Sequence, residues 1–224
     1  MSGWLALHGG GEFQRGSEIG DRRLLAATGA SPAHVIIVPT AAARDYPEMA
    51  ARNGMRWFEQ LGAQAEAALI VDARSANDAQ LVAKLEQAAL IYLPGGDPVL
   101  LVEVLRGSKA WEAITQAYLR GAMLGGASAG AMALGTQLWH PRADKLIDGL
   151  GLIPIVTLPH FRAATLDRAQ ALRQQLDRAT RLFGIAERTS AIWDGSHWTV
   201  WGPGEVVEIT PTGMQRYQSG ESFQ

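Results

Sequence analysis

The chain has 224 residues, 47% of them hydrophobic and 19% charged, which suits one domain with a sizeable core. Twenty Lys and Arg against twenty-two Asp and Glu give a formal net charge of −2, without the excess of positive charge that favours nucleic acid or an anionic membrane. The lack of cysteine excludes disulfides, cysteine-ligated zinc and a cysteine nucleophile. No apolar run approaches the roughly 18 residues of a membrane-spanning helix, and no leader sequence is evident. We therefore expect a single cytoplasmic domain over residues 1–224.

Short apolar runs alternate with longer segments of helical periodicity, a pattern typical of a parallel sheet covered by helices. The expected strands are Trp4–His8, Val35–Val38, Ala67–Val71, Leu90–Leu93, Ala122–Gly125 and Leu152–Leu158. The expected helices are Ile19–Ala27, Pro47–Leu61, a segment from Asn77 or Asp78 to Gln87, Val99–Arg106, Ala110–Arg120, a short one beginning near Gly130, and Ala164–Leu182. Beyond them, Ser190–Trp193, Trp198–Trp201 and Val206–Thr210 predict antiparallel strands. The expected fold class is α/β, with three α/β/α layers, a mostly parallel sheet and a small C-terminal β extension.

Four of the expected strands end in unusual sequences. These are Gly9–Glu12, Gly95–Asp97, Gly126–Gly130 and Pro159–Phe161. Ligands of open α/β sheets bind outside the carboxyl ends of the strands. We therefore expect these four segments to face one crevice.

The sharpest motif in the chain is Gly126-x-Ser128-x-Gly130. A serine in a tight turn between a strand and a helix is lifted clear of the backbone, and small flanking residues permit the strained turn. The helix that follows offers N–H groups and a positive dipole end to an oxyanion. The motif indicates that Ser128 is a nucleophile, against the simpler interpretation of a close-packed helix start.

A serine nucleophile needs a base, and the chain has five histidines. His160 is the one that closes an apolar strand downstream of Ser128, so we expect it to be the general base. Its orienting carboxylate is either Glu187 or Asp194, which flank the strand Ser190–Trp193. The pair Gly95-Gly96 is a candidate for half of an oxyanion hole, because glycine lets a backbone N–H approach the reacting carbonyl.

With these residues in place, the chain resembles peptidase family S51, which includes dipeptidase E (alpha-aspartyl dipeptidase) and cyanophycinase. Five segments in the same order carry the resemblance: Gly9-Gly10-Gly11-Glu12, Tyr92-Leu93-Pro94-Gly95-Gly96-Asp97, Gly126-Ala127-Ser128-Ala129-Gly130-Ala131-Met132, Leu158-Pro159-His160-Phe161 and Gly184-Ile185-Ala186-Glu187-x-Thr189-x-Ala191. That family has a fold similar to class I glutamine amidotransferases, which are flavodoxin-like, with serine in place of their cysteine.

The resemblance implies a serine peptidase that cleaves small peptides, with aspartyl dipeptides as the first expectation, and that needs no metal or organic cofactor. It makes Ser128 the nucleophile, His160 the base and Glu187 the orienting acid. It further implies an oxyanion hole of the Gly96 and Ala129 N–H groups, and substrate contacts from Gly95, Asp97 and Arg162. The chain departs from the family at Pro98, where a Gln or Asn usually helps to hold substrate, and in its looser arginine spacing after the histidine.

Two other functions fit parts of the sequence. An α/β-hydrolase-type esterase shares the serine turn, and would use His197 as base with Asp167 or Asp177 as acid. A catalytically inactive relative would bind a small molecule in the same crevice. The seven tryptophans fit either an ordinary core or the face of a homodimer.

Overall fold

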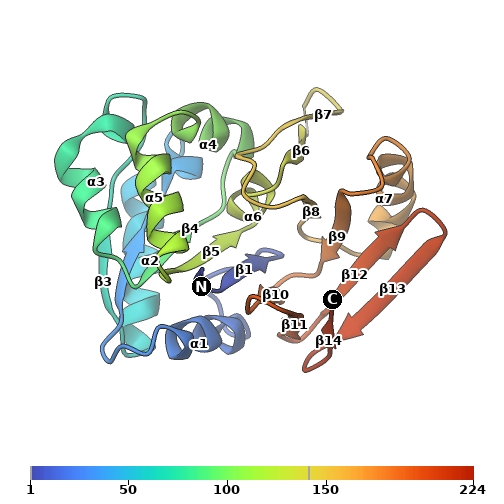
Figure 1. Ribbon diagram of the computed structural model, residues 1–224, viewed down its shortest axis with the longest axis horizontal. Coiled ribbons are helices and arrows are strands. Elements are labelled where there is room, and N and C mark those ends of the chain that lie inside the picture. Colours follow the sequence, from blue (N-terminus) through green and yellow to red (C-terminus); the bar gives the residue numbers. More distant parts are fainter. Residues whose placement is uncertain (1, 141) are drawn as a thin grey trace.

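The computed structural model describes residues 2–140 and 142–224. Within this range the largest sheet has eight strands in the order β14-β11-β10-β1-β5-β4-β2-β3 (Figure 1). Parallel pairing joins β1 (Leu5–His8), β5 (Met123–Ala127), β4 (Leu90–Leu93), β2 (His34–Ile37) and β3 (Gln64–Ala67). The antiparallel strands β10 (Ser190–Trp193), β11 (Trp198–Trp201) and β14 (Ser222–Phe223) extend the sheet beyond β1. The predicted α/β fold with a mostly parallel sheet is confirmed.

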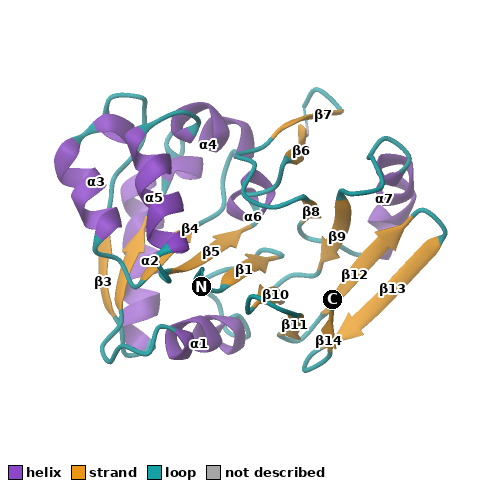
Figure 2. Cartoon of the chain, viewed as in Figure 1, coloured by secondary structure: helices purple, strands orange, loops and turns teal. Residues whose placement is uncertain are grey.

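Helices cover both faces of the parallel strands (Figure 2). One face is covered by α1 (Glu18–Ala27) and α2 (Pro47–Gln60), whose Leu24 and Phe58 are fully buried against Tyr92 of β4. The other face carries α3 (Ala79–Glu86), α4 (Pro98–Leu105), α5 (Lys109–Leu119) and the short α6 (Ala129–Ala133). Strands buried on both faces have continuous apolar sequences, which is why their positions could be predicted.

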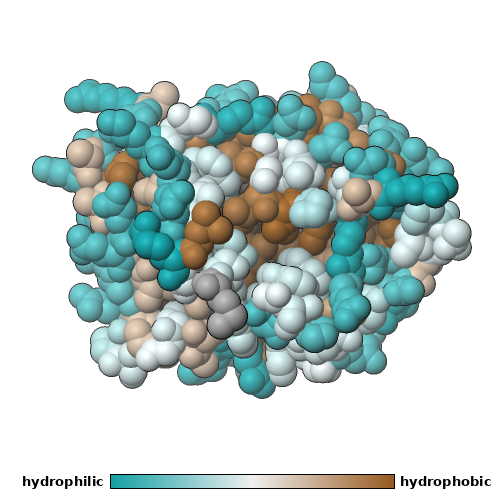
Figure 3. All heavy atoms as spheres, in the orientation of Figure 1, coloured by the Kyte–Doolittle hydropathy of each residue, from teal (hydrophilic) through white to brown (hydrophobic). Residues whose placement is uncertain are grey.

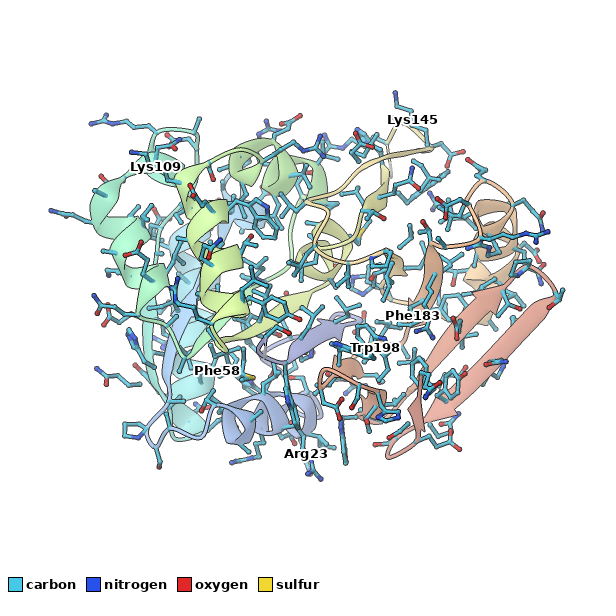
Figure 4. The ribbon with its side chains drawn as sticks, viewed as in Figure 1. Arg23, Phe58, Lys109, Lys145, Phe183 and Trp198 are labelled. Carbon is cyan, nitrogen blue, oxygen red and sulfur yellow. The ribbon has the colours of Figure 1, made fainter. Side chains whose placement is uncertain are left out.

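A second sheet covers one face of the antiparallel strands, in place of helices. Its order is β13-β12-β9-β8, formed by β8 (Ile155–Leu158), β9 (Arg181–Ile185), β12 (Glu205–Thr210) and β13 (Gly213–Gln218). Phe183 of β9 packs edge-on against Trp198 of β11, with ring centroids 5.4 Å apart (Figure 4). The C-terminal β structure is therefore larger than expected, and the strand predicted at Leu152–Leu158 belongs to this sheet rather than to the parallel core.

Shorter elements connect the two sheets. A hairpin of β6 (Gln137–His140) and β7 (Lys145–Asp148) precedes β8, and α7 (Leu166–Arg173) lies between β8 and β9. Single 3-10 turns occupy Thr40–Ala42, Ser75–Asn77 and Ala163–Thr165. Figure 3 shows apolar residues across the middle of one face of the molecule, between the helices on the left and the second sheet on the right.

The strand predicted at Ala67–Val71 is wrong, because β3 covers Gln64–Ala67 instead. Its neighbour β2 ends at Ile37, which pairs with Ala67, so the ladder has no partner beyond that point. Ala68 and Ile70 are nevertheless fully buried. Their apolar character reflects burial in an irregular segment, where the Thr40 hydroxyl donates to the Ile70 carbonyl at 2.7 Å.

The helix predicted at Ala164–Leu182 is wrong in its second half. The helix α7 ends at Arg173, and the chain reaches β9 at Arg181 through a compact turn. The Arg173 side chain is 5% exposed, and its guanidinium donates to the carbonyl oxygens of Leu176 (3.1 Å), Asp177 and Thr180. These hydrogen bonds hold the turn, and they outweigh the helical propensity of the segment.

Candidate active site

Ser128 occupies a sharp turn between β5 and α6, with φ 48° and ψ −108°. A non-glycine residue with positive φ is strained, and such strain is concentrated at functional sites. The flanking glycines make the turn possible. A Cβ on Gly126 would lie 2.7 Å from the carbonyl carbon of Gly130, and one on Gly130 would lie 2.0 Å from the Leu93 carbonyl oxygen. The Gly-x-Ser-x-Gly motif is thus needed for the chain to turn at this point.

Ser128, His160 and Glu187 form one hydrogen-bonded chain. The Ser128 Oγ lies 2.8 Å from Nε2 of His160, and Nδ1 of His160 lies 2.8 Å from Oε1 of Glu187. The side chains of His160 and Glu187 are 49% and 54% exposed, so the group is open to solvent and to a substrate. This is the arrangement in which a base removes the proton of a nucleophile while a carboxylate orients the base.

The expected base and acid follow strands of the second sheet. His160 follows β8, and Glu187 follows β9, two strands that pair in parallel. Residues after neighbouring parallel strands reach the same edge of a sheet, which explains why two side chains 27 positions apart in sequence meet there. Ser128 follows β5 of the main sheet, so the site lies where the ends of both sheets meet.

The glycine loop after β1 joins these segments through three successive carbonyl groups. The His8 carbonyl accepts the Ser128 N–H at 3.0 Å, and the Gly9 carbonyl accepts the His160 N–H at 2.7 Å. The Gly10 carbonyl accepts the N–H of Arg188, the residue after Glu187, at 2.7 Å. The loop therefore fixes the backbones at Ser128, at His160 and next to Glu187 relative to one another.

The two expected oxyanion donors lie beside Ser128. Gly96 and Ala129 line the same cavity as Ser128, and among the described residues neither backbone N–H donates a hydrogen bond. Ala129 is the first residue of α6, where a helix leaves its N–H groups free. Both N–H groups are therefore free to donate to a group bound in this cavity.

Asp97 and Gly95 have structural partners. The Asp97 carboxylate caps α4 by accepting the N–H groups of Val99 and Leu100 at 2.9 and 3.2 Å. The Gly95 N–H donates to Oε1 of Glu12 at 2.7 Å. These hydrogen bonds hold the loop that carries Gly96. Asp97 and Gly95 therefore help to position Gly96 beside Ser128.

A cavity of about 320 Å³ opens beside Ser128. Its lining includes Pro98, Met132, Trp139, Leu158 and Arg168. The Arg168 guanidinium lies over the Trp139 ring, 4.6 Å from its centroid, and 3.3 Å from the Asp144 carboxylate. Nothing in the sequence marks Met132 or Trp139 as cavity residues, because a hydrophobic residue in a short strand or helix is usually part of the core.

Arg162, the arginine expected at the substrate, is not among the residues of that cavity. It lines a separate open hollow of about 700 Å³ with His160, Glu187 and Arg188. Arg168 is thus the arginine that lines a cavity together with Ser128, although it is farther from His160 in sequence.

The alternative acid and base lie at the opposite edge of the main sheet. Trp193, which precedes Asp194, pairs with Leu5 at the start of β1, whereas Ser128 follows Ala127, which pairs with His8 at its end. The Asp194 carboxylate accepts the N–H groups of Ser196 and His197 at 2.9 Å, and the hydrogen bond from His197 is the main reason its pKa is lowered. Asp194 and His197 therefore stabilise a turn far from the nucleophile.

A second polar cluster is buried behind the site. Nδ1 of His8 lies 2.6 Å from the Ser190 hydroxyl, and its Nε2 lies 3.6 Å from Oδ1 of Asp21. The Trp57 indole N–H donates to Oδ2 of Asp21 at 2.8 Å. Burial lowers the pKa of His8 from 6.5 to about 4 and raises the pKa of Asp21 from 3.8 to about 7. His8 and Asp21 are at most 2% exposed and out of reach of a substrate.

The sequence matches the family model of peptidase family S51 over residues 5–200. This chain belongs to peptidase family S51. It is 31% identical over 223 residues to cyanophycinases of Nostoc sp. and Trichormus variabilis, covering 93% of this chain and 73% of each relative. The family supports a hydrolase of the serine peptidase type, and the predicted family is confirmed.

Solved structures agree with this S51 assignment. A peptidase from an acI-B1 actinobacterium superposes with a TM-score of 0.87 at 29% identity, covering 100% of this chain and 97% of that one. A putative peptidase E protein from Listeria monocytogenes superposes with a TM-score of 0.69 at 19% identity, covering 91% of this chain and 100% of that one, and shares the fold. Within the described residues, no helix combines the length and apolar character needed to cross a bilayer.

Proposed function

We propose that this S51 family member is a serine peptidase that cleaves small peptides through Ser128, His160 and Glu187. The observation that carries the proposal is the unbroken chain of two 2.8 Å hydrogen bonds from Ser128 Oγ through His160 to Glu187. Ser128 sits in a strained, partly exposed turn, and His160 is the histidine within reach of its hydroxyl.

The reaction proceeds in two halves. In the first, Ser128 Oγ attacks the peptide carbonyl carbon while Nε2 of His160 accepts the hydroxyl proton, and His160 then gives that proton to the leaving amine as the C–N bond breaks. In the second, His160 takes a proton from water, the hydroxide attacks the acyl ester, and the proton returns to Ser128. Glu187 holds the imidazole with Nε2 facing Ser128 and stabilises the imidazolium.

The backbone N–H groups of Gly96 and Ala129 stabilise the negative charge that develops on the carbonyl oxygen. Their contribution is greatest in the transition state, because a full negative charge accepts hydrogen bonds more strongly than a neutral carbonyl. Loss of one such donor costs about 3 kcal/mol in related chemistry.

Aspartyl dipeptides are the proposed substrates. A side-chain carboxylate needs a cationic partner, and Arg168 supplies one at the cavity that Ser128 lines. Arg168 is held by an exposed ion pair with Asp144, whose side chain is 81% exposed, and such pairs are weak enough to be exchanged for a substrate carboxylate.

The first experiment is labelling with a serine-directed fluorophosphonate, detected by intact mass. Wild-type protein is expected to gain one adduct, Ser128→Ala to gain none, and the surface control Ser196→Ala to label at the wild-type rate. His160→Ala is expected to slow labelling by about 100-fold or more, as loss of a general base does. Folded wild-type protein that remains unlabelled would contradict the proposal and favour an inactive, ligand-binding relative.

A further inference from the structure

The open hollow lined by His160 shares part of its lining with the cavity that Ser128 lines. Pro159, His160 and Thr165 line both spaces, whereas Ser128 and Arg168 line the cavity and not the hollow. The hollow measures about 700 Å³ and the cavity about 320 Å³. A substrate bound at Ser128 can therefore extend past His160 from the cavity into the hollow.

The proton transfer of the proposed reaction decides which part of a substrate reaches the hollow. His160 gives its proton to the leaving amine, so the amine nitrogen must come within hydrogen-bond distance of the imidazole. The other atoms of the leaving residue follow that nitrogen within a few ångströms, because they are bonded to it in sequence. The residue that supplies the carbonyl stays in the cavity with Ser128 and Arg168. The hollow is therefore the space for the leaving residue.

Two arginines give the hollow a net positive charge. Arg162 and Arg188 line it, and Glu187, which supplies a carboxylate there, already accepts a hydrogen bond from His160. Within residues 2–140 and 142–224, neither arginine forms an ion pair. Nη1 of Arg188 donates to the Arg15 carbonyl over a long 3.5 Å, which leaves its other N–H groups free for an anion.

Local structure holds both arginines in place. Arg188 has a φ of +57°, a conformation that is strained for a residue other than glycine. A Cβ on Gly11 would lie 2.8 Å from Cγ of Arg188, and one on Gly16 would lie 3.5 Å from its Cδ, so the side chain packs where two side chains are absent. The Arg162 N–H donates to the Thr165 hydroxyl at 3.1 Å, and that hydroxyl donates to the Arg162 carbonyl at 2.7 Å. Such packing lowers the entropy that a side chain loses on binding.

We propose that this hollow binds the leaving residue of the substrate and favours one with an acidic side chain. The inference rests on the proposed peptidase function, and it adds a second acidic residue to the one that Arg168 is proposed to recognise. One guanidinium suits the α-carboxylate that the leaving residue of any dipeptide carries. The other is left for a carboxylate on the side chain, and a neutral side chain gives it no partner.

The test compares aspartyl-glutamate with aspartyl-glutamine, which has nearly the same shape and lacks the side-chain charge. The ratio of their kcat/KM values is measured for wild type, Arg162→Gln, Arg188→Gln and Arg188→Lys. Fluorophosphonate labelling of Ser128 gives the concentration of reactive protein in each sample. Arg178→Gln, at an exposed position outside the hollow, is the matched control for the loss of one positive charge. Because both dipeptides meet the same triad, a general loss of activity leaves the ratio unchanged.

Wild type is expected to prefer aspartyl-glutamate by about fivefold, mainly through KM, which is the upper range for an exposed ion pair. The preference is expected to fall toward one in about 1 M salt, because salt screens charges that are open to solvent. Arg162→Gln and Arg188→Gln are each expected to lower the ratio to about twofold or less. Arg188→Lys keeps the charge and is expected to keep most of the preference, and Arg178→Gln is expected to keep all of it.

Equal kcat/KM values for the two dipeptides in wild type would overturn the inference and leave the peptidase function intact. Labelling of Ser128 without cleavage of aspartyl-glutamate would overturn it too, because the favoured substrate would then be refused. A preference that persists in both glutamine variants would mean that another part of the protein recognises the charge, and would also overturn it. Wild-type protein that is neither labelled nor active on either dipeptide would overturn the proposed function itself, and the inference with it.

Discussion

Because Gly10 has no side chain, there is room beside it for the imidazole ring of His160. A Cβ at position 10 would lie 2.3 Å from Cε1 and 2.7 Å from Nδ1 of His160. No conformation of a larger residue relieves this, because Cβ is fixed by the backbone, and the φ of +110° at Gly10 is itself unfavourable for any other residue. The orientation of the His160 ring toward Ser128 thus depends on Gly10, in the loop that follows β1.

Gly10→Ala is therefore expected to lower peptidase activity and Ser128 labelling by about 100-fold or more. The added methyl group would push the His160 ring away, so that its Nε2 no longer contacts the Ser128 hydroxyl. Gly29→Ala is the matched control, since Gly29 also has a positive φ, +67°, and has open space around it. That control is expected to cost about 1 kcal/mol in stability and nothing in activity. Equal activity of the two variants would contradict the steric account.

Glu187 and Asp194 are expected to differ sharply on substitution. Glu187→Gln keeps the size of the side chain but loses the charge that stabilises the imidazolium, and kcat is expected to fall by about 100- to 10,000-fold. Asp194→Asn is expected to leave kcat within about twofold of wild type, because Asp194 caps a turn at the other edge of the sheet. Steady-state kinetics of both variants decide between the two acids.

Arg173 is expected to stabilise the fold rather than to serve the reaction. Arg173→Met leaves the carbonyls of Leu176, Asp177 and Thr180 without their donor in a buried turn, and the free energy of unfolding is expected to fall by about 2–4 kcal/mol. Urea denaturation measures this directly. The exposed Arg178→Met is the control, and a similar effect of the two substitutions would show that the turn does not depend on Arg173.

The buried pair of His8 and Asp21 predicts how stability depends on pH. Folded Asp21 has a pKa of about 7, above its usual 3.8, so the folded state holds a proton that the unfolded state loses, and stability falls as pH rises from about 4 to 7. Folded His8 has a pKa of about 4, below its usual 6.5, so the unfolded state binds the proton first, and stability rises over about pH 4–6.5. The two slopes oppose each other.

Asp21→Asn removes the contribution of Asp21 to this pH dependence and leaves that of His8. Its stability relative to wild type is expected to increase on going from pH 4 to pH 7, by about 3 kcal/mol. The unfolding free energies of both proteins, measured by urea denaturation at several pH values, test the sign. A difference that stays constant across this range would mean that Asp21 titrates alike in the folded and unfolded states.

The parallel core and the nucleophile turn could be predicted because each leaves a strong local pattern. Leu90–Leu93 is a continuous apolar run, and the Gly-x-Ser-x-Gly spacing around Ser128 reflects close backbone approach. The region after His160 leaves no such pattern, because the turn at Arg173 depends on hydrogen bonds to carbonyls, which are invisible in side-chain periodicity. In the sequence Trp139 looks like an ordinary core residue. Its position in the cavity follows from the hairpin of β6 and β7, which the sequence does not reveal.

The origin of the triad from two sheets has a consequence for how the protein loses activity. Ser128 and both oxyanion donors belong to loops of the main sheet, whereas His160 and Glu187 follow strands of the second one. If the two sheets moved apart by even a few ångströms, the backbone pairing within each sheet would remain intact. Nε2 of His160 would, however, no longer reach the Ser128 hydroxyl. We therefore expect the reactivity of Ser128 to report whether the two sheets are docked, and to fall in heat or denaturant before the secondary structure is lost.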